Sequence, residues 1–344
     1  MATTVESHRC VEEYHAPFWL PGGHLQTLYA AFLDRRYRVG YRRERWDTPD
    51  GDFIDLDWVV GEPDKPLLVL FHGLEGGSSS HYALSLMHAV RKLNWRGVVV
   101  LFRGCSGEIN RLPRAYHSGD SAEVSWILRR LKTQNPQSTI YAIGVSLGGN
   151  VLLKWLGEQG EEAINVINAA AAVSAPLDML AAGDHLGQGF NLFYTRAFLA
   201  SMKEKFLEKL KRFPKLADRE AMLRSMTLRQ FDDVVTAPLH GYKNTDDYWT
   251  RASSKPGLIN IRVPTLLINA KNVPFLPASS LPSPAEVSAA VTLDFPDTGG
   301  HAGFVSGAFP GHLDWLPCRI LDFFQDEQEN QVHLYHGEYG ENLT

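Results

Sequence analysis

Residues 139–157 read TIYAIGVSLGGNVLLKWLG, and the fold class follows from this stretch. The apolar run that ends at Val145 predicts a buried strand, and the residues from Leu147 onward predict a helix. Between them lies Gly-Val-Ser-Leu-Gly (144–148), the only Gly-x-Ser-x-Gly of the chain. A serine on a sharp strand-to-helix turn, with glycines that avoid backbone clashes, is typical of a nucleophile elbow. We therefore interpret Ser146 as a candidate nucleophile, with an idle serine in a glycine-rich turn as the alternative.

The same alternation continues on both sides of this turn. Apolar runs that predict further buried strands fall at 66–73, 97–104, 166–175, 263–270 and 289–296. Helix-like stretches follow at 81–93, 119–133, 147–159 and 311–325. This order predicts an α/β protein with a mainly parallel, doubly wound sheet.

The predicted α/β core comprises residues 51–177 and 256–325, and residues 1–50 are expected to pack on it as an N-terminal extension. Residues 178–255 contain no convincing strand and include FLASMKEKFLEKLKRF (198–213), whose apolar residues recur at helical spacing. A basic amphipathic helix of this kind can lie on a membrane surface. We favour a helical cap over the sheet edge, because the apolar stripe needs a core to face. Residues 326–344 read as a polar, loosely held tail.

The composition is that of an ordinary globular protein, with 44% hydrophobic and 21% charged residues in 344. A net charge of −5 gives no reason to expect a nucleic acid as partner. No signal peptide is recognisable, and no apolar run approaches the roughly 20 residues that stable membrane insertion requires. Three widely spaced cysteines suggest neither a disulfide framework nor a zinc site, which favours a cytoplasmic protein. The oligomeric state is not indicated.

Two further loops fit a serine-based site. Gly-Gly-His-Ala-Gly (299–303) follows the last apolar run, and a histidine in such a loop can reach Ser146 and accept its proton. His301 is therefore the candidate base. An earlier strand ends in Phe-His-Gly-Leu (71–74), where the N–H of Leu74 can join that of Leu147 in an oxyanion hole. His72 lies too early in the chain to be the base, since in folds with a nucleophile elbow the site residues follow in the chain order serine, acid, histidine.

Other polar groups receive structural interpretations. Cys105 is more readily explained as a structural cysteine than as a reactive one. Tyr116, His117 and Asp120 either shape a pocket or cap the next helix, and we favour the cap. The pairs Asp232-Asp233 and Asp246-Asp247 suggest solvated caps or turns, and no histidine cluster joins them at metal-ligand spacing. No dinucleotide or phosphate-binding fingerprint is present.

The combination of these segments resembles the YheT-like α/β-hydrolase family, a group related to the eukaryotic ABHD esterases. The residues that carry the resemblance span nearly the whole chain: HLQT (24–27), DGDFIDLDW (50–58), FHGLEGGSSSHYA (71–83), FRGCSGEINRLPRAYHSGD (102–120), GVSLGGN (144–150), VSAPLD (173–178), FDDVVTAPLHGY (231–242), INAKNVPFLP (268–277) and GGHAGFVSG (299–307). The resemblance implies an α/β-hydrolase fold with a helical cap. It also implies Ser146 as nucleophile, His301 as base, and Leu74 and Leu147 as oxyanion donors.

One position departs from the family pattern. The stretch after the apolar run 263–268 usually carries the catalytic acid, and here Val273 stands at that position, preceded by Asn272. Valine cannot orient an imidazole or stabilise an imidazolium. Asp178 or Asp297 could replace the acid, Asn272 could orient the histidine as Asn does in papain-like sites, or the site could work as a Ser–His dyad of lower activity.

We expect a serine hydrolase that cleaves small carboxylic esters with short- to medium-chain acyl groups through an acyl-enzyme. No metal or organic cofactor is implied. An acyltransferase that passes the acyl group to an alcohol is the first alternative. A catalytically impaired or non-catalytic scaffold, motivated by Val273, is the second.

Overall fold

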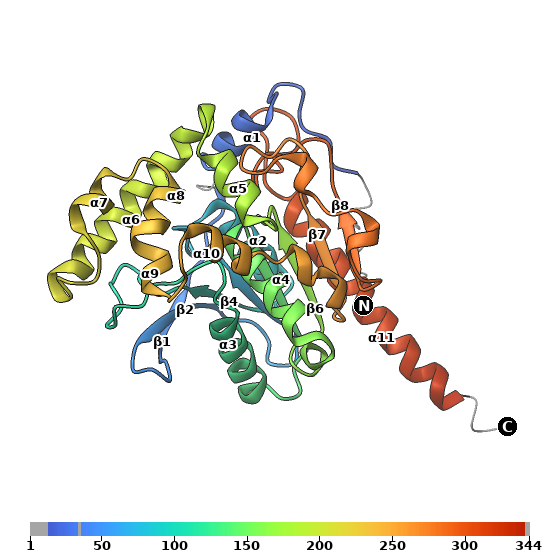
Figure 1. Ribbon diagram of the computed structural model, residues 1–344. Coiled ribbons are helices and arrows are strands. Elements are labelled where there is room, and N and C mark those ends of the chain that lie inside the picture. The colour runs from blue at the N-terminus through green and yellow to red at the C-terminus, as the bar shows by residue number, and fades with distance from the viewer. Residues whose placement is uncertain (1–12, 34–35, 341–344) are drawn as a thin grey trace.

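The computed structural model describes residues 13–33 and 36–340, with side chains as far as residue 330. Within this part of the chain, eight strands form one sheet in the order β1-β2-β4-β3-β5-β6-β7-β8 (Figure 1). The strands are β1 Arg42–Asp47, β2 Phe53–Val59, β3 Leu67–Phe71, β4 Arg96–Leu101, β5 Ile140–Val145, β6 Ala169–Val173, β7 Thr265–Ile268 and β8 Val291–Asp294. Strands β3 to β8 pair in parallel, which confirms the predicted α/β class.

Helices cover both faces of this sheet. The longer helices are α1 Gly23–Ala30, α2 His81–Lys92, α3 Ser121–Gln134, α4 Leu147–Gln159, α5 Met179–Leu186, α6 Leu192–Arg212, α10 Thr245–Ala252 and α11 Trp315–Gly340. Short helices are α7 Arg219–Arg224, α8 Leu228–Phe231 and α9 Ala237–Leu239, and Asp232–Thr236 is a π-helical turn. Helices α3 and α4 pack on one face of the sheet and α2 and α11 on the other, as a doubly wound sheet requires.

The strands β1 and β2 were not expected from the sequence. Residues 42–47, assigned to the N-terminal extension, form the edge strand of the sheet and pair antiparallel with β2. Their residues RRERWD lack an apolar run, and β2 carries two buried aspartates. Each aspartate is neutralised by the arginine directly opposite in the register, Asp55 by Arg45 and Asp57 by Arg43, with N–O distances of 2.8 Å. Cross-strand ion pairing therefore replaces the hydrophobic alternation that marks other strands.

Residues 178–255 hold α5 to α10 and contain no strand, and Figure 1 shows α6 to α9 standing to one side of the sheet. Their apolar side chains form a cluster of their own, which also includes Phe275 from the loop after β7. On α6, Phe206 and Leu210 belong to this cluster, so the apolar stripe faces protein. This packing removes the reason for placing the helix on a membrane surface.

The C-terminal helix differs from its predicted extent. A helix was expected over 311–325, but α11 begins at Trp315 and continues to Gly340. Most of the segment read as a polar tail is therefore the second half of this helix, and residues 341–344 lie outside the described residues.

Candidate active site

Ser146 stands at the junction of β5 and α4 in a strained backbone conformation. Its φ of 55° and ψ of −122° are values that a residue with a side chain rarely adopts. The neighbouring glycines leave no room for a Cβ: one added to Gly144 would lie 2.4 Å from the carbonyl oxygen of Gly148, and one on Gly148 would lie 2.3 Å from that of Phe71. The glycine spacing read from the sequence thus meets the steric demand of this turn.

The loop after β3 lies directly beside this serine. A Cβ at Gly73 would approach the Ser146 Cβ to 3.0 Å and its Oγ to 3.6 Å. The amides on either side of Leu74 are held by tyrosines: the Tyr82 hydroxyl accepts from the N–H of Gly73, and the Tyr116 hydroxyl from the N–H of Glu75, each at 2.9 Å. Leu147 is the first residue of α4, so its N–H belongs to the donors that a helix leaves unused.

His72 has a structural position in this loop. Its Nε2 accepts a hydrogen bond from the N–H of Phe102 at 3.1 Å, and its Nδ1 lies 2.7 Å from the carbonyl oxygen of Gly73. Burial lowers the pKa of His72 to about 4, so the ring is neutral at physiological pH. His72 therefore braces the loop.

The His301 ring lines the same pocket as Ser146 and packs against Phe275, with ring centroids 4.1 Å apart. Its Nδ1 is buried, and no hydrogen-bond partner for it exists among the described residues. Burial, and secondarily the nearby His81, lower the pKa of His301 to about 3. Within the described residues no hydrogen bond joins its ring to Ser146. Such contacts are often long before substrate binds.

The backbone of the histidine loop is held by helix α1. The Thr27 hydroxyl accepts the N–H of His301 at 2.9 Å, and Gln26 Oε1 accepts the N–H of Gly299 at 2.9 Å. Gln26 is fully buried. This helix contains the HLQT segment (24–27), for which the sequence indicated no role. The adjacent polar residues Gln26 and Thr27 in that motif were the signal available.

The acid position contains no carboxylate in contact with His301. Val273 is buried and packs with Ala182 and Leu276. Asn272 does not orient the ring: its Nδ2 donates to Gln26 Oε1 at 2.9 Å, and its Oδ1 accepts from the N–H of Gly300 at 3.0 Å. Asn272 therefore ties the loop after β7 to the histidine loop through backbone and α1.

The two aspartates considered as substitutes are engaged elsewhere. Asp178 caps α5, where its carboxylate accepts from the N–H of Ala181 at 3.1 Å. Asp297 is 84% exposed and pairs with Lys271 at 2.7 Å. Neither forms a hydrogen bond with His301 in this structure.

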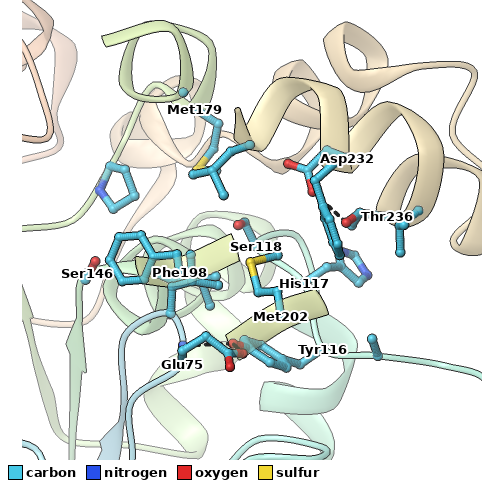
Figure 2. A pocket seen from close by; sticks show the side chains of 18 of the residues that line it. Glu75, Tyr116, His117, Ser118, Ser146, Met179, Phe198, Met202, Asp232 and Thr236 are labelled. Atoms are coloured by element: carbon cyan, nitrogen blue, oxygen red, sulfur yellow. Dashed lines mark hydrogen bonds between the residues drawn. The ribbon is translucent and has the colours of Figure 1, made fainter. Parts of the chain in front are cut away.

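The pocket that contains Ser146 and His301 extends under the helical segment 178–255 (Figure 2). Its apolar wall includes Met179, Leu186, Phe198, Met202, Phe206 and Phe231. The opposite end is polar, where Figure 2 shows His117, Asp232 and Thr236 across the cavity from Ser146. This arrangement can receive an extended, largely apolar group bonded to a carbonyl carbon at the serine.

For several polar residues near this end, the structure differs from the interpretation that the sequence favoured. Tyr116 and His117 line the pocket, whereas Asp120 forms an ion pair with Arg114 at 2.6 Å. Asp232 is buried, accepting from Trp249 Nε1 at 2.8 Å, and burial raises its pKa to about 6. The expectation that Asp232 is a solvated cap residue is therefore wrong. Its π-helical turn directs the carboxylate inward.

Two cysteines, Cys105 and Cys318, lie in the described part of the chain, and they differ in state; Cys10 lies outside the described residues. Burial raises the pKa of the Cys105 thiol to about 11, so it stays protonated at neutral pH, in agreement with the structural interpretation. Cys318 is disulfide-bonded, contrary to the expectation from the sequence that no disulfide framework is present. The cysteine pattern therefore gives no support for a reducing compartment, and the cytoplasmic assignment stays a prediction.

No group of three or more His, Cys, Asp or Glu side chains in the described part of the chain is arranged to hold a metal ion. Among the described helices, none has the length and apolar character needed to cross a membrane.

Comparison with known proteins places these features in context. A family model described as the α/β-hydrolase fold matches residues 66–308. The chain is 40% identical over 305 residues to "Putative esterase YheT" of Escherichia coli, covering 87% of this chain and 89% of that protein. It is 30% identical to human "Phospholipase ABHD3", covering 94% and 81%. The solved structure of Est1E from Butyrivibrio proteoclasticus with ferulic acid shares the fold, with a TM-score of 0.55, 13% identity, and coverage of 85% and 100%.

Proposed function

The chain belongs to the α/β-hydrolase family, in its YheT-like branch, and from this premise we propose that it is a serine hydrolase of carboxylic esters. The observation that carries the proposal is the strained Ser146 turn, which opens into a pocket also lined by His301. Backbone strain at a non-glycine residue persists where the surrounding structure enforces it, and such residues concentrate at functional sites.

In the proposed reaction, His301 removes the proton of the Ser146 hydroxyl as its oxygen attacks the ester carbonyl. The N–H groups of Leu74 and Leu147 stabilise the oxyanion of the tetrahedral intermediate. His301 then gives its proton to the leaving alcohol, and a water molecule resolves the acyl-enzyme by the same steps in reverse. No metal or organic cofactor takes part in this scheme.

Burial keeps His301 neutral at rest, as a base must be, but a pKa of about 3 also makes it a weak base, which agrees with a slow enzyme. Its unpartnered Nδ1 supports the dyad alternative, in which no carboxylate stabilises the imidazolium that forms. In a serine protease, replacing the acid by Asn lowers kcat by about 10⁴ while residual catalysis persists. We therefore propose a slow enzyme, with Val273 as the cause of its reduced rate.

The substrate follows from the pocket wall and from the relatives. Phe198, Met202 and Phe206 of α6 offer an apolar surface for an acyl group, and the helical segment 178–255 acts as a cap over it. The human relative is named a phospholipase. We propose esters with short- to medium-chain acyl groups, because the polar residues at the far end limit the apolar length.

Hydrolysis of p-nitrophenyl esters of graded chain length, by the protein and by its Ser146→Ala variant, tests the proposal. Turnover that is lost in the variant establishes the nucleophile, and the chain-length profile reports the pocket. Equal release by both proteins for every ester would refute the esterase proposal. Product analysis with an added alcohol separates hydrolysis from acyl transfer, since an acyltransferase would convert the ester into a new ester.

A further inference from the structure

The loop that carries Leu74 is held from the helical segment as well as from the core. Glu75 has a φ of 56°, an unfavourable value for a residue with a side chain, so something must keep this backbone in place. From the core, the hydroxyl of Tyr116 accepts the N–H of Glu75 and donates to its carboxylate Oε1 at 2.8 Å. Figure 2 shows both residues at the edge of the pocket.

The second carboxylate oxygen of Glu75 is bound by helix α6. Lys205 Nζ lies 2.8 Å from Glu75 Oε2, and the Ser201 hydroxyl donates to the same oxygen. Ser201 and Lys205 are four positions apart, so they share one face of the helix. The carboxylate is only 8% exposed, and Lys205 also contacts the sulfur of Cys105 at 3.4 Å. With the Lys205 side chain 29% exposed, this is a partly buried ion pair with well-placed additional bonds, in contrast to a surface pair of little consequence.

Other contacts also attach α6 to the core. One turn further on, Lys209 Nζ donates to Asn110 Oδ1 at 2.6 Å and to the carbonyl oxygens of Leu112 and Arg114 at 2.8 and 2.9 Å. The apolar side of the helix is also packed into its own cluster. Removing the Lys205 contact should therefore loosen the loop at Glu75 more than it displaces helix α6.

We propose that Lys205 and Ser201 are positioning residues that act through Glu75 to hold the N–H of Leu74 where the oxyanion forms. This inference rests on the proposed hydrolase function and deepens it, because the helical segment then controls the chemical step as well as the pocket wall. An interaction that acts only on the transition state changes kcat and leaves KM almost unchanged.

Lys205→Met is the variant that tests this role, with Lys205→Arg as the conservative replacement. Removing a complete oxyanion donor costs about 10²–10³ in kcat, and a displaced donor should cost about tenfold or more. We expect kcat to fall by that factor in Lys205→Met with KM within about twofold, and the arginine variant to recover most of it. Inhibition by a trifluoromethyl ketone, which forms a tetrahedral oxyanion with serine, should weaken in proportion to kcat.

Lys211→Met is the matched control, because Lys211 lies on the same helix and pairs with Glu208 at the surface. An unchanged kcat in Lys205→Met, or a change no larger than in the control, would overturn the inference. So would a loss that appears in KM alone, since that indicates a role in the pocket wall only.

Hydrogen exchange of the amides in residues 73–77 gives a second readout that requires no turnover. We expect faster exchange there in Lys205→Met, with unchanged exchange in α4. Identical exchange in both proteins would overturn the inference even if the esterase assay fails. An inactive wild-type protein whose loop is loosened by Lys205→Met would count against the proposed function while supporting the contact between α6 and the loop.

Discussion

The Thr27 hydroxyl accepts a hydrogen bond from the backbone N–H of His301 at 2.9 Å, across 274 positions of the chain. The same hydroxyl group donates its hydrogen to the carbonyl oxygen of Gly23 at 2.7 Å, as a threonine one turn into a helix commonly does. Helix α1 therefore fixes the loop that presents the proposed base.

Thr27→Val should lower kcat by about 10- to 100-fold, because the histidine loop loses an anchor and small displacements of a reacting group are costly. The shape of the side chain is retained. Thr133→Val is a suitable control, since Thr133 makes the same type of bond to a carbonyl four residues earlier in an exposed helix. Equal kcat in the two variants, measured with one p-nitrophenyl ester, would contradict a positioning role for Thr27.

Val273→Asp should raise kcat, by as much as about 10⁴, since a carboxylate would supply the partner that His301 Nδ1 lacks. Val273→Asn has a similar size without the charge and should raise kcat far less. Steady-state kinetics of the wild-type protein and of the two variants test this prediction. A decrease in kcat for the aspartate variant would mean that the buried valine serves packing with Ala182 and Leu276 that activity requires.

The pH dependence of kcat/KM should differ between the wild-type protein and the Val273→Asp variant. With a pKa of about 3, His301 stays neutral on acidification, so we expect the wild-type profile to remain flat from pH 8 down to about 5. In Val273→Asp the carboxylate would favour the protonated imidazole and raise its pKa, which moves the acidic limb to higher pH. A wild-type limb near the ordinary histidine value of about 6.5 would contradict the buried, unpaired ring.

Asp178→Asn and Asp297→Asn should each leave kcat within about twofold of the wild type. Asparagine can still cap α5, and the exposed pair of Asp297 with Lys271 contributes little to stability. The esterase assay on both variants is sufficient. A loss of 10²-fold or more in either one would identify it as the catalytic acid, reached through a rearrangement on substrate binding.

Gly148→Ala should destabilise the fold, because the new Cβ would lie 2.3 Å from the carbonyl oxygen of Phe71. Overpacking of this kind typically costs about 1–3 kcal/mol in the free energy of unfolding. Gly40→Ala is the control, since its Cβ would enter open space. Urea unfolding of both variants tests the prediction, and equal midpoints would contradict the close packing of the elbow.

The central strands and the serine turn could be predicted because their signals are local. The buried runs that became β3 and β5 are continuous in sequence, and the glycines at 144 and 148 report a steric demand within one turn. His301 could be singled out because chain order in this fold restricts the choice among histidines. The structure brings it into the pocket that Ser146 lines, and its role as base stays a prediction.

The remaining features depend on partners far away in the sequence. Strand β2 is stabilised by arginines on β1, so its aspartates gave no strand signal. The inward carboxylate of Asp232 depends on the indole N–H of Trp249. The role of Gln26 depends on Gly299 and Asn272, which lie 273 and 246 positions away. No local pattern contains such information.

The anchoring of the histidine loop by α1 also has a consequence for biosynthesis. On the ribosome, α1 emerges well before residue 301, so its docking site is completed only after about 270 further residues have been synthesised. The parallel strands can assemble while α1 remains undocked, because none of their pairings involves it. Catalytic competence would then be acquired late, in a maturation step that docks α1 onto the loop at residue 301.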